Sequence, residues 1–312
     1  MPDFSGGSFS WNGMKRFLFL LVTAFASELS AQIDPVKYPV FTDIQEALAS
    51  KEPVKSMSFR ERGIFDVPKE IGQLDSLFFL NLMGNNLEKM SPEIFSLTEL
   101  QYLNLNKNGI KYIPAEIRQL QQLETLQMSI NSLTQINPEL GKLKKLKIIH
   151  LDANNLNVFP EALLEIPTLE EINLSSNQIN FVPEALHTIT NLKSLNLAYN
   201  QLNELSEIRL PKNINSLELQ RNALTMLPDG LFNAQNLQFL NLSDNSIESI
   251  SPKIRKLKGA VSINLANNQL KDLPQQITRL KNLKTLLLNG NPIPETRVEE
   301  LRKLMPQTQI YF

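Results

Sequence analysis

The sequence predicts an α/β solenoid of eleven repeats, with a parallel sheet on its concave face and a helical cap at each end. Three observations predict it. From Val54 onward, an apolar residue recurs at offsets 0, 3, 5, 10, 13, 17 and 20, and the frame restarts every 23 residues. Two alternating apolar residues in each unit indicate a short strand with one inward face. Prolines later in many units disfavour long regular helices there.

The repeat frame is nearly unbroken, with one 22-residue step between Leu192 and Ile214. Stacked strands about 4.8 Å apart would give a concave face roughly 48 Å long, which is enough to hold a protein. The predicted divisions are 1–31 (an upstream segment and signal peptide), 32–53 (N-terminal cap), 54–293 (repeats) and 294–312 (C-terminal cap). The repeats start at Val54, Leu77, Leu100, Leu123, Leu146, Leu169, Leu192, Ile214, Leu237, Ala260 and Leu283.

Composition excludes several function classes. The chain is 42% hydrophobic and 20% charged, which suits a folded protein rather than a disordered one. Its net charge of -1 offers no basic footprint for nucleic acid. It has no cysteine, which removes disulfides, thiol catalysis, cysteine-ligated zinc and a lipid-modified cysteine. No Gly-rich phosphate loop or other cofactor motif is present, so we expect no cofactor.

The N-terminal segment has the pattern of a signal peptide. Lys15 and Arg16 precede the apolar run 17–26, and small residues follow up to Ala31. A membrane span needs about 20 apolar residues, so we expect cleavage and no retained anchor. Cleavage after Ala31 is favoured over cleavage after Ala26. Met14 directly precedes the basic pair, so it is an alternative start of translation. The predicted destination is outside the inner membrane, in the periplasm, on the cell surface or in the medium.

An asparagine recurs at the ninth position of the repeats, where the chain turns away from its strand. Its side-chain amide can satisfy backbone groups that this turn leaves unpaired, so we assign it a structural role. Only the first repeat departs, with Arg62. The asparagines are Asn85, Asn108, Asn131, Asn154, Asn177, Asn200, Asn222, Asn245, Asn268 and Asn291.

Both ends of a solenoid expose core and need caps. At the front, Thr42 and Gln45 match a capping box that opens a short helix with Ile44, Ala47 and Leu48 inward. At the back, Pro294 leads into a helix predicted over 295–305. Its inward residues are predicted to be Val298, Leu301 and Leu304, after which Ile310 and Phe312 close the sheet.

The chain resembles the leucine-rich repeat family, through stretches such as 100–108 (LQYLNLNKN) and 283–291 (LKTLLLNGN). A Leu-Pro-x-x-Ile-like piece in many units, as at Ile113-Pro114 and Leu273-Pro274, resembles the Ras-suppressor-type subclass. The resemblance implies a binding solenoid of the kind common among exported bacterial proteins. Eukaryotic extracellular members usually cap with disulfides, so the absence of cysteine points to bacterial export or an intracellular origin.

Outward positions three, five and seven of each repeat are the candidate contact positions. Most carry small polar residues, which are typical of a solvated face: Asn81, Asn104, Gln127, Asn173, Asn196, Asn241, Asn264, Ser129, Ser175 and Ser243. Phe79, Met83 and Tyr102, flanked by Phe78, depart from this pattern and predict an apolar ligand-binding patch. The alternative is that the N-terminal cap helix folds over them.

A second candidate patch combines His150, Asp152 and Glu171 on two neighbouring strands. A recognition role is favoured over a metal site, because one His and two carboxylates on an open sheet make a weak metal site. The alternative is an ordinary solvated polar surface. A Ser175–His150–Asp152 triad is disfavoured, because His150 and Asp152 lie about 6.7 Å apart along one strand. His187 is expected on the convex side. The lysines between Lys142 and Lys147 are expected to form a solvated rim.

The leading hypothesis is an exported, non-enzymatic protein that binds a protein or peptide on its concave face. Two alternatives stay open: a protein that binds envelope glycans or has a structural role there, and an intracellular scaffold of the Ras-suppressor type. The sequence identifies neither the ligand nor the oligomeric state.

Overall fold

The structure is a computed structural model that describes residues 39–205 and 208–312. Contacts divide the chain into two compact units, Met1–Val40 and Phe41–Phe312, and the second unit is considered below. The predicted signal peptide, both of its cleavage sites and the first part of the predicted N-terminal cap lie outside the described residues. Strand β1 (Val40–Phe41) spans the boundary between the units. No helix in the described ranges is long and apolar enough to span a bilayer.

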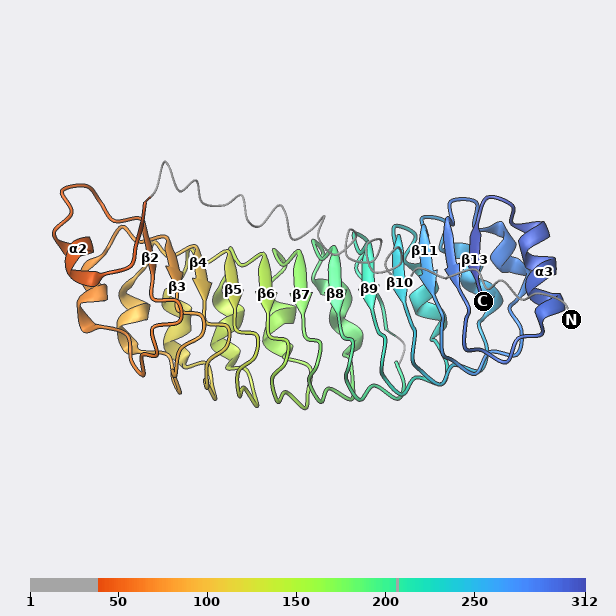
Figure 1. Cartoon of the computed structure of the whole chain (residues 1–312), viewed down its shortest axis with the longest axis horizontal. Helices are drawn as coiled ribbons and strands as arrows, with labels where there is room; N and C mark the ends of the chain where they lie inside the picture. Colours follow the sequence, from red (N-terminus) through yellow and green to blue (C-terminus); the bar gives the residue numbers. More distant parts are fainter. Residues whose placement is uncertain (1–38, 206–207) are drawn as a thin grey trace, which may run out of the picture. The chain divides into compact units, whose positions relative to one another are not determined.

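The strands of the second unit follow one another in chain order and pair in parallel (Figure 1). One strand comes from each repeat, and the last comes from the C-terminal segment, so the predicted parallel sheet is confirmed. The strands are β2 (Ser56–Ser58), β3 (Phe79–Asn81), β4 (Tyr102–Asn104), β5 (Thr125–Gln127), β6 (Ile148–His150), β7 (Glu171–Asn173), β8 (Ser194–Asn196), β9 (Ser216–Glu218), β10 (Phe239–Asn241), β11 (Ser262–Asn264), β12 (Thr285–Leu287) and β13 (Gln309–Tyr311).

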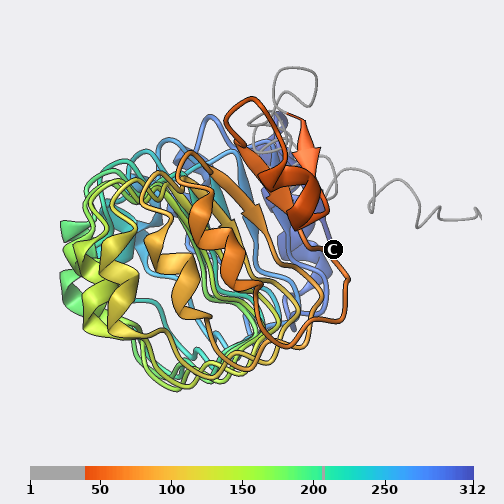
Figure 2. The same ribbon diagram turned by 90° about the vertical axis from the view of Figure 1, so that its left-hand side faces the viewer.

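Short 3₁₀ helices stack on the other side of the second unit (Figure 2). Most begin directly after the repeat's proline, which fixes φ but cannot donate within a longer helix. Each is five residues long, which agrees with the prediction that long regular helices are absent from these segments. The helices are η2 (Lys69–Gln73), η3 (Pro92–Ser96), η4 (Ala115–Gln119), η5 (Pro138–Lys142), η6 (Glu161–Glu165), η7 (Glu184–Thr188), η8 (Asp229–Asn233), η9 (Pro252–Lys256) and η10 (Gln275–Arg279).

The repeating apolar positions form one continuous core between the strands and the 3₁₀ helices. In the third repeat, for example, Leu100, Leu103, Leu105, Ile110, Ile113, Ile117 and Leu120 are all buried. Each repeat buries its apolar residues against its neighbours, because no single repeat is large enough to enclose them.

The N-terminal cap helix is α2 (Ile44–Leu48). Asp43, and not Thr42, is its N-cap, because the Asp43 carboxylate accepts from the amides of Gln45 and Glu46 at 2.8 and 3.0 Å. The predicted capping box is therefore wrong by one residue. The inward side is as predicted, since Ala47 is buried and Ile44 and Leu48 pack on the core.

The C-terminal cap helix is α3 (Glu295–Leu304), followed by β13. Val298 and Leu301 are buried as predicted, but Leu304 is 45% exposed and Met305 takes its place in the core. The inward spacing is thus three and then four residues, as the helical period of 3.6 requires. Ile310 is buried in β13, whereas Phe312 is 44% exposed and does not close the sheet.

The ninth-position asparagines join each repeat to the preceding one. Asn154 donates to the carbonyl oxygens of Leu151 in its own repeat and of Met128 in the repeat before, both at 2.9 Å. Its Oδ1 accepts from the amide of Leu133, also in the repeat before, at 3.0 Å. The first repeat has no repeat before it to bind, which accounts for Arg62 at this position.

The eighth position adopts a left-handed backbone conformation in all the repeats. Two repeats carry glycine there, Gly84 and Gly290, and the others carry residues with φ between 52° and 56°. This conformation costs roughly 1 kcal/mol for a residue with a Cβ. Ile130 is the least suited, because a branched Cβ adds further crowding.

We expect Asn154→Ala to lower the free energy of unfolding by about 1–3 kcal/mol, because it leaves one amide and two carbonyl groups without their partner. Urea unfolding of the purified chain measures the loss. The control is Asn155→Ala, at the exposed next position, which should change stability little. Equal losses in the two variants would contradict the structural role of Asn154.

We expect Ile130→Gly to raise the free energy of unfolding by about 1 kcal/mol, because glycine enters the left-handed region without strain. Thr134→Gly, four residues further on at an exposed position with ordinary φ, should instead lower it. Thermal unfolding compares the two, and a loss of stability in Ile130→Gly would refute the strain.

Candidate functional site

The outward face of the sheet carries the third and fifth residues of each repeat, because the fourth residue points into the core. In β3, for example, Phe79 and Asn81 are partly exposed while Leu80 is fully buried. Side chains at equivalent positions of neighbouring strands lie side by side, so these positions form rows across the sheet.

All six fifth-position asparagines proposed as contact residues make a local hydrogen bond that the sequence did not reveal. The side-chain oxygen accepts from the amide of the residue two further along, which closes a turn at the end of the strand. Asn81, for instance, accepts from the amide of Met83 at 3.0 Å. The others with this bond are Asn104, Asn173, Asn196, Asn241 and Asn264.

The predicted aromatic patch forms a ring stack. Phe79 and Tyr102 are register partners on β3 and β4, and their ring centroids lie 4.7 Å apart with planes 14° from parallel. Met83 follows β3 at the seventh position of the same repeat as Phe79 and is partly exposed. The cap helix α2 packs its own apolar side on the core. Burial raises the pKa of the Tyr102 phenol, and a hydrogen bond with Asn104 lowers it in part.

Gln127 connects the aromatic stack to the His150 patch. The Tyr102 hydroxyl donates to the Gln127 Oε1 at 2.9 Å, and Gln127 is the register partner of His150. In the next strand, His150 Nε2 lies 2.8 Å from Glu171 Oε1, and both side chains are mostly buried. The two patches that the sequence predicted separately are therefore contiguous.

Asp152 joins the same surface by a different set of bonds. Its Oδ1 accepts from Ser129 Oγ at 2.6 Å and from Asn173 Nδ2 at 3.0 Å. Ser175 Oγ donates to Asn173 Oδ1 at 2.9 Å and not to His150. The disfavoured triad is thus not assembled. Across residues 39–205 and 208–312, no three His, Cys, Asp or Glu side chains are grouped as metal ligands.

These residues make one surface across five strands, which we call the β3–β7 face. Four strand spacings give it a length of about 19 Å. It combines a stacked aromatic pair, a methionine, an amide, an imidazole and two carboxylates. The β3–β7 face consists of Phe79, Met83, Tyr102, Gln127, His150, Asp152 and Glu171.

Glu218 is a candidate that sequence analysis missed. It is the last residue of β9 and takes the fifth position of its repeat, where most repeats have asparagine, and this difference was the available signal. Burial raises the pKa of its carboxyl group, and hydrogen bonds from Asn241 and Gln220 lower it in part. Asn241 Nδ2 donates to Glu218 Oε2 at 3.0 Å.

The remaining candidates lie away from the sheet face. His187 is in η7, and its Nδ1 is 3.1 Å from the Glu184 carbonyl oxygen. In the lysine stretch, Lys147 pairs with Glu124 at 2.7 Å, and Lys144 donates to the carbonyl oxygen of Gly141 at 2.7 Å. The rim is thus held to the repeats beside it.

Comparisons with known proteins match this architecture. A family model described as a leucine-rich repeat region matches residues 93–222, and one described as a leucine rich repeat matches residues 212–254. A search of curated proteins gave no match.

Three solved structures illustrate the likeness. A leucine-rich-repeat protein of Leptospira interrogans is 29% identical, with a TM-score of 0.51 over 85% of this chain and 87% of that one. The internalin InlF of Listeria monocytogenes is 20% identical, with a TM-score of 0.60 over 83% of this chain and 67% of that one. The FLRT2 leucine-rich repeats, in an octameric complex with latrophilin 3 and Unc5D, are 22% identical, with a TM-score of 0.71 over 82% and 83%. The last two show the fold alone.

We expect Glu218→Gln to stabilise the chain near pH 7. Because burial raises the carboxyl pKa above its ordinary value of 4.5, the folded chain holds this proton to a higher pH than the unfolded chain does. The contribution of the Glu218 carboxyl group to the free energy of unfolding is thus fully present below pH 4.5. It is lost as the pH rises through the folded-state pKa. Glutamine keeps the bond from Asn241 and removes the charge.

The measurement is the urea midpoint between pH 4 and pH 8. The gain in Glu218→Gln should grow with pH and vanish at the acid end. The exposed Glu248→Gln is the control and should show no such trend. A gain that is equal at both ends of the range would rule out the buried carboxyl as its cause.

Proposed function

This chain is a leucine-rich-repeat protein, and from that premise we propose that it is a non-enzymatic binding protein that recognises a protein or peptide on its sheet face. The observation that carries the proposal is the Phe79–Tyr102 stack at one end of the β3–β7 face. Aromatic side chains bury a large area with few rotatable bonds, so they are frequent anchors of protein interfaces.

The polar half of the β3–β7 face supplies specificity in this proposal. The His150–Glu171 pair and Asp152 lie beside the aromatic anchor and are already oriented by hydrogen bonds, so little side-chain freedom is lost when a ligand binds. The FLRT2 repeats, which have the same fold, were solved in a complex with other proteins. Fold alone does not identify a partner.

Export and subclass are part of the proposal. The basic pair at Lys15 and Arg16, the apolar run after it and the absence of cysteine support secretion by a bacterial route. The Leu-Pro-x-x-Ile-like pieces support the Ras-suppressor-type subclass. Cell fractionation tests export: a chain that starts near Gln32 in the periplasm, on the surface or in the medium supports it. A full-length chain in the cytosol would favour the intracellular scaffold instead.

A glycan ligand is less favoured. In a glycan-binding protein the row of fifth-position asparagines would meet sugar hydroxyls with free amide oxygens. In six repeats that oxygen instead accepts a backbone amide of its own turn.

We expect Phe79→Ala combined with Tyr102→Ala to weaken binding of the native partner by about 30-fold or more, the effect of losing a hot spot of about 2 kcal/mol. Crosslinking capture from the native cell identifies the partner, and titration calorimetry with that purified partner measures the affinity. The double variant Val158→Ala, Phe181→Ala removes two exposed apolar side chains from another part of the repeats and serves as the control. Unchanged affinity in the first variant would exclude the β3–β7 face as the binding site.

A further inference from the structure

The charges of neighbouring repeats are paired along much of the solenoid. Three lysines form ion pairs with glutamates: Lys111 with Glu88 at 2.9 Å, Lys147 with Glu124 at 2.7 Å and Lys193 with Glu170 at 2.6 Å. In each pair the two residues are 23 positions apart, so they occupy the same place in consecutive repeats. The sequence thus sets opposite charges against each other where repeats stack.

The ninth and tenth repeats break this rule on the side of the 3₁₀ helices. Segments 252–259 and 274–282 contain six Lys and Arg and no Asp or Glu. Lys256 and Arg279 are 23 positions apart and equivalent, as are Lys258 and Lys281. Like charges at equivalent positions of stacked repeats repel each other, so this arrangement costs stability.

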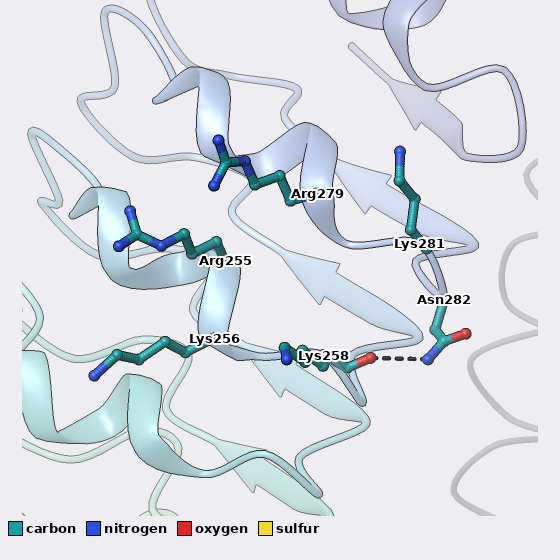
Figure 3. A pocket seen from close by; sticks show the side chains of 6 residues that line it. All are labelled: Arg255, Lys256, Lys258, Arg279, Lys281 and Asn282. Carbon is teal, nitrogen blue, oxygen red and sulfur yellow. Dashed lines mark hydrogen bonds between the residues drawn. The ribbon is translucent and has the colours of Figure 1, made fainter.

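Five of these cations surround an open depression of about 560 Å³ (Figure 3). Arg255 and Lys256 come from η9, and Arg279 comes from η10. Asn282 lies at its edge and donates to the Lys258 carbonyl oxygen at 2.8 Å. Among the described residues, none of the five forms an ion pair; the sixth cation, Lys253, pairs with Asp229 outside the depression.

We propose that this depression, lined by Arg255, Lys256, Lys258, Arg279 and Lys281, binds a compact ligand that carries clustered phosphate or sulfate groups. Guanidinium and ammonium groups are the side chains that bind such oxyanions, and arginine does so with two parallel bonds. The whole chain has a net charge of -1, so the excess of positive charge is local. A bound oxyanion would offset the repulsion between the stacked cations.

Acidic residues on both sides limit the size of the ligand. Asp229 begins η8 before the depression, and Glu295, Glu299 and Glu300 follow it in α3. The positive surface is therefore confined to two neighbouring repeats. An extended nucleic acid would need a longer basic stripe, whereas a short oligophosphate fits.

Titration calorimetry with inorganic tripolyphosphate tests the site in the full chain. We expect saturable binding that weakens with added salt, because charge pairs on an exposed surface are screened. The double variant Lys256→Gln, Lys258→Gln should raise the Kd by about tenfold or more, through the loss of two charge-assisted contacts.

The chain offers a matched control in its fourth repeat. Lys142 and Lys144 occupy the same two positions there, but the next repeat has Glu165 opposite Lys142. Lys142→Gln with Lys144→Gln makes identical substitutions and the same change in net charge, and should leave the Kd within about twofold. Thermal unfolding of each variant confirms that it is folded.

A second arm distinguishes a free oligophosphate from a lipid headgroup. Flotation with vesicles of phosphatidylglycerol and phosphatidylcholine is compared with flotation with phosphatidylcholine alone. The proposal is supported if the chain binds either anionic probe and the double variant Lys256→Gln, Lys258→Gln does not. Which of the two probes binds identifies the source of the oxyanions. Absence of saturable binding to both probes, or equal weakening in the control variant, would overturn it. Neither outcome bears on the β3–β7 face, because the protein-binding test uses a different partner and different residues.

Discussion

The hydrogen bonds of the ninth-position asparagines are the interaction on which the rest of the structure depends. Each repeat turns sharply after three strand residues, and the turn exposes amides and carbonyls that no neighbouring strand can reach. The asparagine side chain provides a donor and an acceptor at that point, and it bonds backbone groups of two repeats. Asn154, for example, bonds Leu151 in its own repeat and Met128 and Leu133 in the repeat before. The same bonds therefore close the turn and fix how the repeat stacks on the preceding one. This stacking places the strands in register.

Because of this constraint, most positions of each repeat serve the fold, and their side chains are not free to contact a ligand. The seven apolar positions fill the core, the ninth holds the turn, and the eighth must adopt a left-handed conformation even where it carries Ile130 or Tyr199. The fifth position, which a sheet pattern alone marks as free, is also used by the backbone wherever it is asparagine. What remains are the departures at the outward positions. They include Gln127, His150 and Glu218 at position five, Phe79, Tyr102 and Glu171 at position three, and Met83 and Asp152 at position seven.

The sequence predicts the fold well because the period is carried by many residues, and an error at one position does not shift the frame. Details that depend on a single bond or on helix phase are predicted less well. Thr42 and Asp43 are both acceptable N-caps, and only backbone geometry selects Asp43. Leu304 and Met305 both suit an inward position, and the phase of α3 buries Met305. The aromatic and His150 patches were each predicted, but their continuity through Gln127 follows from a side-chain bond across strands, which periodicity does not encode.

A solenoid in which each repeat contacts only its neighbours can keep separate surfaces independent of each other. The β3–β7 face is built from the second to sixth repeats and lies on the sheet, whereas the cationic depression is built from the ninth and tenth repeats beside the 3₁₀ helices. The stacked cations lower stability only in the ninth and tenth repeats. The Phe79–Tyr102 stack exposes apolar surface only in the second and third repeats. In each case the buried core and the asparagine hydrogen bonds of the same repeats offset the loss of stability. Local departures from the repeat pattern can therefore accumulate along the chain without weakening the frame that holds the others.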